Sequence, residues 1–255
     1  MSGRLALLLT LAILLISPLA GARRASIKQA GFRYVSAAAP RVEKGHPIPP
    51  PLIPLPPVRQ HSASVCGLAC LQSVFAYAGK PSLRGSQLVR RARSGKDGFT
   101  YEVGTPEKTM RKLVQGMGLT ARSSTRMSLK TLVGHVASGV PVTVGIQAWV
   151  DNPAKVNWRK EQNAGHYVVA IGIGDKKGRR ITSTRGLLKR DDAYVWFMDP
   201  AMDLGKRGYI PLKEFMARWH WPSESGKGQS RFGLATMLDG PPAQASFVGG
   251  VGRIE

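Results

Sequence analysis

A cysteine, a histidine and an aspartate follow one another along this chain in an order that suits a nucleophilic triad. Gln60 precedes Cys66 by six positions, His166 follows a glycine, and Asp199 precedes a proline. A thiolate can attack a carbonyl carbon while a histidine takes and returns the proton and an acid orients the imidazole. A glutamine amide can join the cysteine's own backbone N–H in holding the oxyanion. These residue types therefore predict covalent thiol chemistry.

The two cysteines of the chain, Cys66 and Cys70, belong to the same short motif. On one helix at positions i and i+4 their Cβ atoms would lie about 5–6 Å apart, whereas a relaxed disulfide needs about 3.8 Å. We therefore expect two free thiols. Cys66 should open a helix, where the helix dipole and an imidazolium both stabilise a thiolate. Cys70 suits the role of a small buried side chain.

The candidate base and acid lie at the two ends of neighbouring apolar runs. Of the five histidines, only His166 stands between a glycine and a long run of strand-forming residues. Asp199 closes the next such run. If the two strands are adjacent and antiparallel, the end of the second lies beside the start of the first, and Asp199 can hold the Nδ1–H of His166. A turn aspartate before a proline is the alternative interpretation of Asp199.

Elements that must position these residues can be predicted from periodicity. Apolar residues at helical spacing predict helices in the first half, and β-branched and aromatic runs predict strands in the second half. A helical half followed by a sheet half predicts an α+β fold. The predicted helices cover residues 68–78, 105–116 (with Thr105 as cap and Pro106 at the first position), 128–139 (capped by Ser128) and 213–219. The predicted strands cover 142–149, 166–173, 193–198 and 232–238, and a long basic loop covers 175–192.

The N-terminal residues have the pattern of an export signal. Arg4 is followed by an apolar run over residues 6–16 and by a small-residue cleavage site at Ala20-Gly21-Ala22. We therefore expect a signal peptide over residues 1–22 and a location in the bacterial periplasm or outside the cell. An uncleaved N-terminal membrane anchor is the alternative, although the apolar run is shorter than a comfortable span of about 20 residues.

The remaining boundaries follow from composition. Residues 23–57 end in a proline-rich run and are expected to be an extended spacer, or a propeptide that lies across the active-site cleft. Residues 58–239 should form the folded domain. Residues 240–255, rich in Gly, Pro and Ala, are expected to be a flexible tail.

The charge of the chain is strongly basic. Its 255 residues include 37 Lys and Arg against 15 Asp and Glu, which gives a formal net charge of +22. Such a chain can adhere to an acidic polymer or to a membrane surface. The basic residues form many short clusters without a nucleic-acid-binding motif, so no specific nucleic-acid partner is expected. A solvated basic surface is the simplest interpretation.

The motifs resemble those of the bacteriocin-processing double-glycine peptidases, peptidase family C-thirty-nine, and in particular their stand-alone exported relatives. The resemblance covers about residues 58–238 and rests on Gln60, on residues 66–71 and 165–169, and on Asp199-Pro200. It implies a papain-like cysteine peptidase fold in which the helical first half packs on an antiparallel sheet.

The same resemblance implies the roles of the residues. Cys66 would be the nucleophile, His166 the base, Asp199 the orienting acid and Gln60 an oxyanion-hole donor, with no metal or other cofactor. The implied function is an exported cysteine peptidase that cleaves a peptide or isopeptide bond of a peptide or protein substrate through a thioester. A non-catalytic peptide-binding member and a cell-wall amide hydrolase are the alternatives. Val65 stands where the family often has Asp or Ser before its cysteine. No ATP-binding transporter is fused to the domain, so cutting of double-glycine leaders is not implied.

Overall fold

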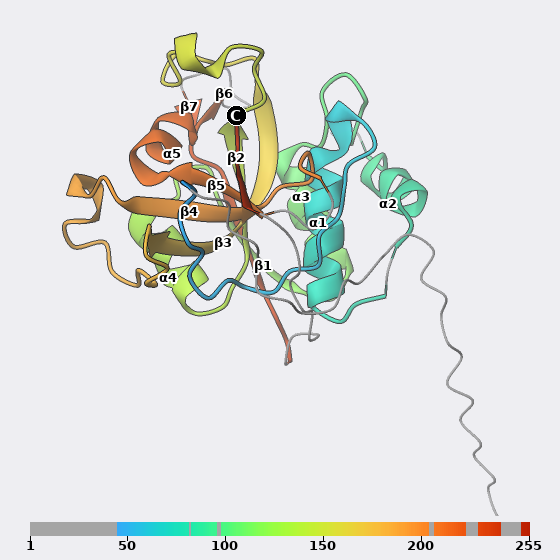
Figure 1. Ribbon diagram of the computed structural model, residues 1–255. Helices are drawn as coiled ribbons and strands as arrows, with labels where there is room; N and C mark the ends of the chain where they lie inside the picture. Colours follow the sequence, from blue (N-terminus) through green and yellow to red (C-terminus); the bar gives the residue numbers. More distant parts are fainter. Residues whose placement is uncertain (1–44, 82, 96–97, 204–206, 223–228, 241–250) are drawn as a thin grey trace, which may run out of the picture. The chain divides into compact units, whose positions relative to one another are not determined.

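A seven-stranded sheet with helices packed beside it forms the described part of the chain (Figure 1). The computed structural model describes residues 45–81, 83–95, 98–203, 207–222, 229–240 and 251–255. The strand order is β1-β8-β2-β3-β4-β5-β9, and every neighbouring pair is antiparallel except β5 and β9. The strands of this sheet are β1 (Thr120–Ser124), β2 (Val142–Gln147), β3 (Gly165–Asp175), β4 (Ala193–Met198), β5 (Arg207–Pro211), β8 (Gly233–Met237) and β9 (Val251–Arg253), while β6 (Trp221–Pro222) and β7 (Gln229–Ser230) pair separately.

Helices α1, α2 and α3 pack together beside the sheet, which confirms the predicted α+β class. The helices are α1 (Cys66–Tyr77), α2 (Gly85–Ala92), α3 (Glu107–Gly116), α4 (Leu129–Ala137) and α5 (Leu212–Arg218). Ser128 caps α4 as predicted, since its Oγ accepts from the Thr131 N–H at 3.0 Å. Thr105 does not cap α3, because Pro106 occupies the N-cap position and the Thr105 side chain is buried.

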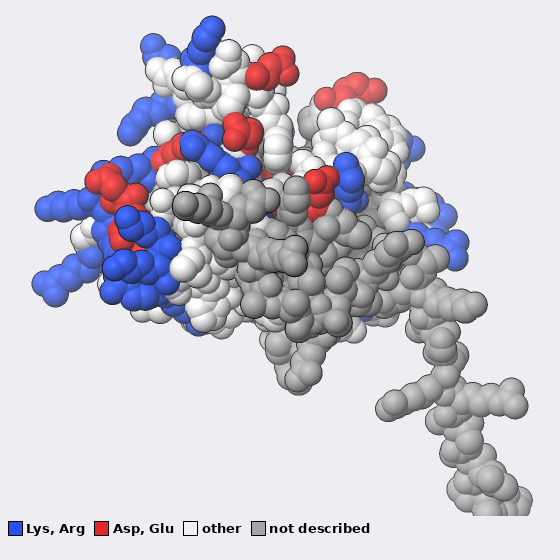
Figure 2. Space-filling view, viewed as in Figure 1, with Lys and Arg blue, Asp and Glu red and all other residues white. Residues whose placement is uncertain are grey.

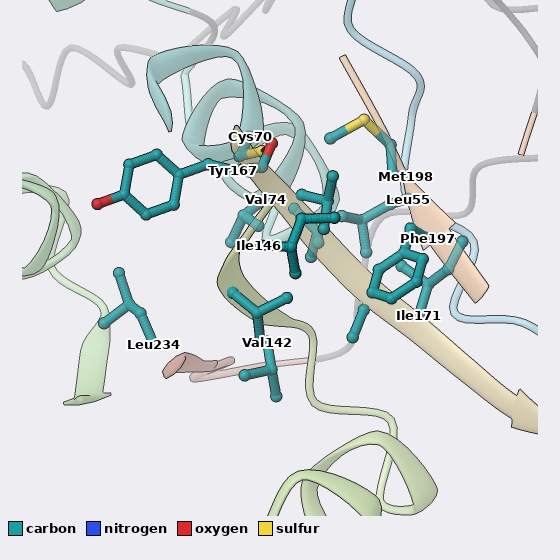
Figure 3. Packing of buried hydrophobic residues seen from close by; sticks show 14 of the residues in the cluster. Leu55, Cys70, Val74, Val142, Ile146, Tyr167, Ile171, Phe197, Met198 and Leu234 are labelled. Atoms are coloured by element: carbon teal, nitrogen blue, oxygen red, sulfur yellow. Dashed lines mark hydrogen bonds between the residues drawn. The ribbon is translucent and has the colours of Figure 1, made fainter. Parts of the chain in front are cut away.

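The core lies between α1 and the central strands. Cys70 and Val74 of α1 are fully buried, as are Ile146 of β2 and Ile171 of β3 (Figure 3). Every residue of β2 is buried, as expected of a strand covered on both faces. The register of β3 and β4 shifts at Ile171, which forms a bulge.

The prediction that the folded domain begins at residue 58 is wrong. Ile53 and Leu55 are buried in the core, and the Ile53 N–H donates to the carbonyl of Ile171 at 2.8 Å. A Cβ added to Gly172 or Gly174 would overlap Leu52 or Pro50, so these glycines let the proline-rich run lie on β3. Proline and leucine side chains thus dock where a free spacer was expected. Residues 1–22 and 23–44, which carry the predicted signal peptide and the rest of the spacer, lie outside the described residues.

The prediction of a flexible tail is also wrong for its last five residues. Residues 251–253 form β9, parallel to β5, and Ile254 is fully buried. The Ile254 N–H donates to the Tyr209 carbonyl at 3.1 Å. An uncovered β5 would be an exposed sheet edge, and Val251 and Ile254 supply the apolar side chains that cover it. Residues 241–250 of the predicted tail lie outside the described residues.

The long basic segment between β3 and β4 is anchored by the buried carboxylate of Asp175. The Arg179 side chain lies 2.7 Å from Asp175 Oδ2, and the Lys177 N–H donates to Oδ1 at 3.0 Å. Burial by itself raises the pKa of Asp175, but hydrogen bonds from Arg179 and Lys177 outweigh it and lower the pKa to about 2. Figure 2 shows Lys and Arg side chains gathered over this segment, at the left of the view. Within the described ranges, no helix has the length and apolarity to cross a membrane.

Candidate active site

Cys66 is the first residue of α1, as predicted. A short 3-10 turn over Ala63–Val65 leads into the helix, and Cys66 is 7% exposed. The positive end of the helix dipole favours a thiolate at this position. A Cβ added to Gly67 would lie 3.1 Å from the Tyr167 ring and 3.2 Å from Thr105, so the glycine allows the start of α1 to approach β3.

His166 and Asp199 form a hydrogen-bonded pair. Asp199 Oδ1 lies 2.7 Å from His166 Nε2, and both residues are buried. The pairing of Val169 with Met198 places Asp199 diagonally across from His166 on the same face of the sheet. The prediction that two antiparallel strands bring these residues together is therefore confirmed.

The prediction that Asp199 contacts Nδ1 of His166 is wrong, because Asp199 Oδ1 contacts Nε2 instead. The Nδ1 atom is nearer to the backbone of β3, and α1 packs on that strand. The His166 side chain lies close enough to the Cys66 thiol to lower its pKa, and Nδ1 is the nitrogen left to face the thiol. Nε2, which is farther from the β3 backbone, contacts Asp199 just after the end of β4.

The two groups shift each other's protonation. Burial by itself raises the pKa of the Cys66 thiol, but the hydrogen bond and charge of His166, with the N–H groups of Tyr167 and Gly67, lower it below its ordinary value. Burial by itself lowers the pKa of His166, but the charge and hydrogen bond of Asp199, followed by Cys66, raise it to about 10. Both shifts favour a thiolate beside an imidazolium.

Trp149 also contacts the His166–Asp199 pair, a contact that was not predicted from the sequence. Its indole Nε1–H donates to Asp199 Oδ2 at 3.2 Å, and its ring meets the His166 ring edge-on at 6.5 Å between centroids. The residue was predicted to end a strand, but its φ of 63° takes it out of β2. Its backbone N–H donates to the Glu255 carbonyl, so β9 ends beside this turn. The only indication of this contact in the sequence was an aromatic residue at the end of a run of strand-forming residues.

Cys70 is chemically distinct from Cys66. Both thiols are free, as expected. Cys70 is fully buried and its Sγ–H donates to the Tyr167 carbonyl at 3.2 Å. Burial, and then the charges of Cys66 and Asp199, raise the pKa of the Cys70 thiol well above its ordinary value. Cys70 is therefore a packing residue.

Gln60 lies next to the loop that carries Asp199 and Pro200. Its backbone N–H donates to the Pro200 carbonyl at 2.9 Å, and its side-chain Nε2–H donates to the Ser62 carbonyl at 3.1 Å. Its Oε1 is buried and has no hydrogen-bond partner among the described residues. The oxyanion role of Gln60 stays a prediction.

A cleft of about 310 Å³ opens at Cys66. Tyr167 and Trp221 stack on each other at 5.2 Å between ring centroids along one side. A Cβ added to Gly165 would overlap the Trp221 ring, so the glycine before His166 makes room for this stack. No group of three or more metal-ligating side chains occurs in the part of the chain described. The lining residues are Ala63, Ser64, Cys66, Glu102, Val103, Gly104, Thr105, Gln162, Asn163, Gly165, Tyr167 and Trp221.

A thiol at a helix start, facing a His–Asp pair on an antiparallel sheet, defines a papain-like α+β protein. The chain belongs to the Peptidase_C39 like family, whose model matches residues 52–225. This match confirms the family that the motifs indicated and supports a peptidase-type function. No curated protein matches the chain.

Several solved structures are similar to the chain. A protein described as a C39-like peptidase from Bacillus anthracis is 17% identical, with 76% of this chain and 97% of that chain covered and a TM-score of 0.48. The peptidase domain of Streptococcus ComA, a bi-functional ABC transporter involved in a quorum sensing pathway, is 14% identical over 72% and 99% of the two chains, with a TM-score of 0.44. A double glycine motif protease from an AMS/PCAT transporter, in complex with the leader peptide, is 18% identical over 75% and 96%, with a TM-score of 0.40.

Proposed function

We propose that this protein is an exported cysteine peptidase that cleaves a peptide or isopeptide bond with Cys66 as the nucleophile. The observation that carries the proposal is the 2.7 Å contact between His166 Nε2 and Asp199 Oδ1, beside a Cys66 thiol whose pKa the same imidazole lowers. A module that only binds peptides has no need of this charge arrangement. Export rests on the predicted signal peptide over residues 1–22.

The geometry supports a two-step acyl transfer. The Cys66 thiolate attacks the carbonyl carbon, and the His166 imidazolium gives its proton to the leaving amine as the C–N bond breaks. Water then attacks the thioester carbon and His166 takes a proton from it; the C–S bond breaks, the acid product leaves, and the Cys66 thiolate re-forms beside the protonated imidazole. Asp199 stays ionised and holds the imidazole in place. The Cys66 N–H and the Gln60 amide are the proposed oxyanion donors.

The cleft suits an extended peptide. Tyr167 and Trp221 offer an apolar face for a side chain, while Gln162 and Asn163 offer amides for backbone hydrogen bonds. The left-handed Gly104, with a φ of +82°, lets its loop approach the cleft without a side chain. These features favour peptide over a small-molecule substrate.

The test is labelling with a thiol-reactive peptide mimic, followed by hydrolysis of a generic fluorogenic peptide. Wild-type protein and Cys70→Ala should be labelled and active, and Cys66→Ala should be neither. Labelling without hydrolysis of any peptide would mean that the protein binds peptides but does not cleave them. Digestion of peptidoglycan in preference to denatured protein would instead establish a cell-wall amide hydrolase.

A further inference from the structure

A second cavity, separate from the Cys66 cleft, is lined by three arginines. Its volume is about 440 Å³, and its described lining contains no acidic residue. Met216, Ala217 and Trp219 supply apolar surface, whereas the cations lie on the surrounding segments. The lining residues are Thr125, Arg126, Arg159, Met216, Ala217, Trp219, His220 and Arg231. Three arginines around a cavity that is partly polar and partly apolar are suited to an anionic ligand with a carbon skeleton.

Two of these arginines are held opposite each other by the backbone. Arg126 and Arg231 face each other in an isolated β-bridge, and the Met127 N–H donates to the Arg231 carbonyl at 3.1 Å. Neither guanidinium has a hydrogen bond or ion pair with a described residue. Like charges directly opposite each other across a bridge repel. An anion between them would remove this repulsion.

The rest of the wall is fixed in place by its own contacts. His220 Nε2 donates to the Trp158 carbonyl at 2.7 Å, and the Arg218 guanidinium lies 3.6 Å from the centre of the Trp158 ring. These contacts hold the backbone beside Arg159, the third arginine of the cavity. Little rearrangement is therefore needed when a ligand enters.

The cavity and the Cys66 cleft lie on one continuous stretch of chain. Trp219 and His220 line the cavity, and the next residue, Trp221, lines the cleft. The segment that carries Arg159 continues to Gln162 and Asn163, which also line the cleft. A peptide seated at Cys66 could therefore extend past Trp221 towards the arginines.

We propose that this arginine cavity binds an acidic segment of the peptide substrate, away from the bond that is cut. The inference rests on the proposed peptidase function. It favours a peptide over a phosphate or sulfate group because the cavity shares a stretch of chain with the Cys66 cleft, and because Met216, Ala217 and Trp219 supply apolar surface that an inorganic anion would not contact.

The test measures binding on the Cys66→Ala protein, so that its outcome does not depend on turnover. The probe is a short peptide of alternating Glu and Ala, and the same peptide with Gln for Glu is its control. The double substitution Arg126→Gln and Arg231→Gln should weaken binding of the acidic peptide about tenfold. Arg90→Gln with Arg185→Gln removes the same charge at two exposed sites elsewhere and should change binding less than about twofold.

The second readout is turnover by protein with Cys66 intact. For a substrate with a Glu-rich extension, the cavity variant should raise KM, with kcat unchanged and with turnover of the unextended peptide unchanged. Equal binding losses in both double variants, or none in the cavity variant, would overturn the proposal. So would cavity-dependent binding of inorganic phosphate or phosphatidylglycerol vesicles that exceeds binding of the acidic peptide. Cavity-dependent binding by a protein that hydrolyses no peptide would overturn the peptidase function and leave an acidic-peptide binder.

Discussion

At the scale of single residues, two thiols four positions apart on one helix have opposite chemistry. Cys66 faces an imidazole and N–H groups that stabilise negative charge, whereas Cys70 is fully buried beside the Tyr167 carbonyl and near Asp199. Iodoacetamide at neutral pH should therefore modify Cys66 first and Cys70 only on unfolding. Peptide mapping by mass spectrometry measures both rates. Equal rates, or faster labelling of Cys70, would contradict the assignment of the nucleophile.

The coupled shifts of Cys66 and His166 predict a broad active pH range. Activity should appear at a pH below the thiol's ordinary pKa, as Cys66 becomes a thiolate. It should fall as His166 loses its proton near pH 10, because the leaving amine then lacks a donor. Measurement of kcat/KM against pH shows both limbs. In His166→Ala, the thiol pKa measured by ultraviolet absorbance should move towards the free value of about 8.5; an unchanged thiol pKa would exclude the pair.

Trp149 and Asp199 predict a graded series of effects. Trp149→Phe keeps an aromatic ring beside His166 but removes the N–H that reaches Asp199 Oδ2. We expect kcat to fall about tenfold with KM unchanged, since a hydrogen bond to a charged group contributes about 1.5–3 kcal/mol. Asp199→Asn should lower kcat further but leave measurable activity. Trp158→Phe, at a tryptophan that packs under Arg218 instead, should leave kcat unchanged. A harmless Asp199→Asn would make Asp199 only a turn residue.

At the scale of elements, the last strand completes the sheet and reaches the site. Ile254 is fully buried against Gly208, and the Glu255 carbonyl accepts from Trp149 N–H. Ile254→Ala should lower the free energy of unfolding by about 2–4 kcal/mol, because it leaves a cavity beside β5. Ile48→Ala makes the same truncation at a half-exposed site and should cost less than about 1 kcal/mol. Urea denaturation compares the two; equal effects would mean that β9 contributes little.

At the scale of the whole molecule, the pH dependence of stability should depend on Asp175. Its pKa of about 2 lies below the unfolded value of about 3.9. Its contribution is therefore present above the unfolded pKa and is lost as the pH falls towards 2. Wild type should be more stable than Asp175→Asn at neutral pH, and the difference should shrink between about pH 4 and 2. Urea denaturation across this range measures it, and a constant difference would mean that the carboxylate charge is not what stabilises the loop.

The overall charge of +22 sets the background for any acidic partner. Exposed charges are screened at about 8 Å in physiological salt. Attraction from the whole surface should therefore be weak at that ionic strength. The opposed Arg126 and Arg231 retain a local advantage because their spacing is fixed by the backbone.

The sequence by itself determined the elements whose signals are local. Helices α1, α3, α4 and α5 and strands β2, β3, β4 and β8 were predicted because each has an apolar pattern of its own period, and a glycine marks the end of α1, α3 and α4. The positions of Cys66, His166 and Asp199 on those elements followed. Helix α2 was missed because only Leu88, Val89 and Ala92 of its eight residues are apolar and buried.

Only the tertiary structure decided how distant segments meet. The three residues of β9 have too little pattern to predict a strand, and they form one because β5 offers an open edge. The same holds for the proline-rich run, which docks where Gly172 and Gly174 leave space. The choice of Nε2 by Asp199 depends on α1 approaching β3 from the other side. These outcomes depend on contacts between residues far apart in the chain, and local periodicity carries no information about such contacts.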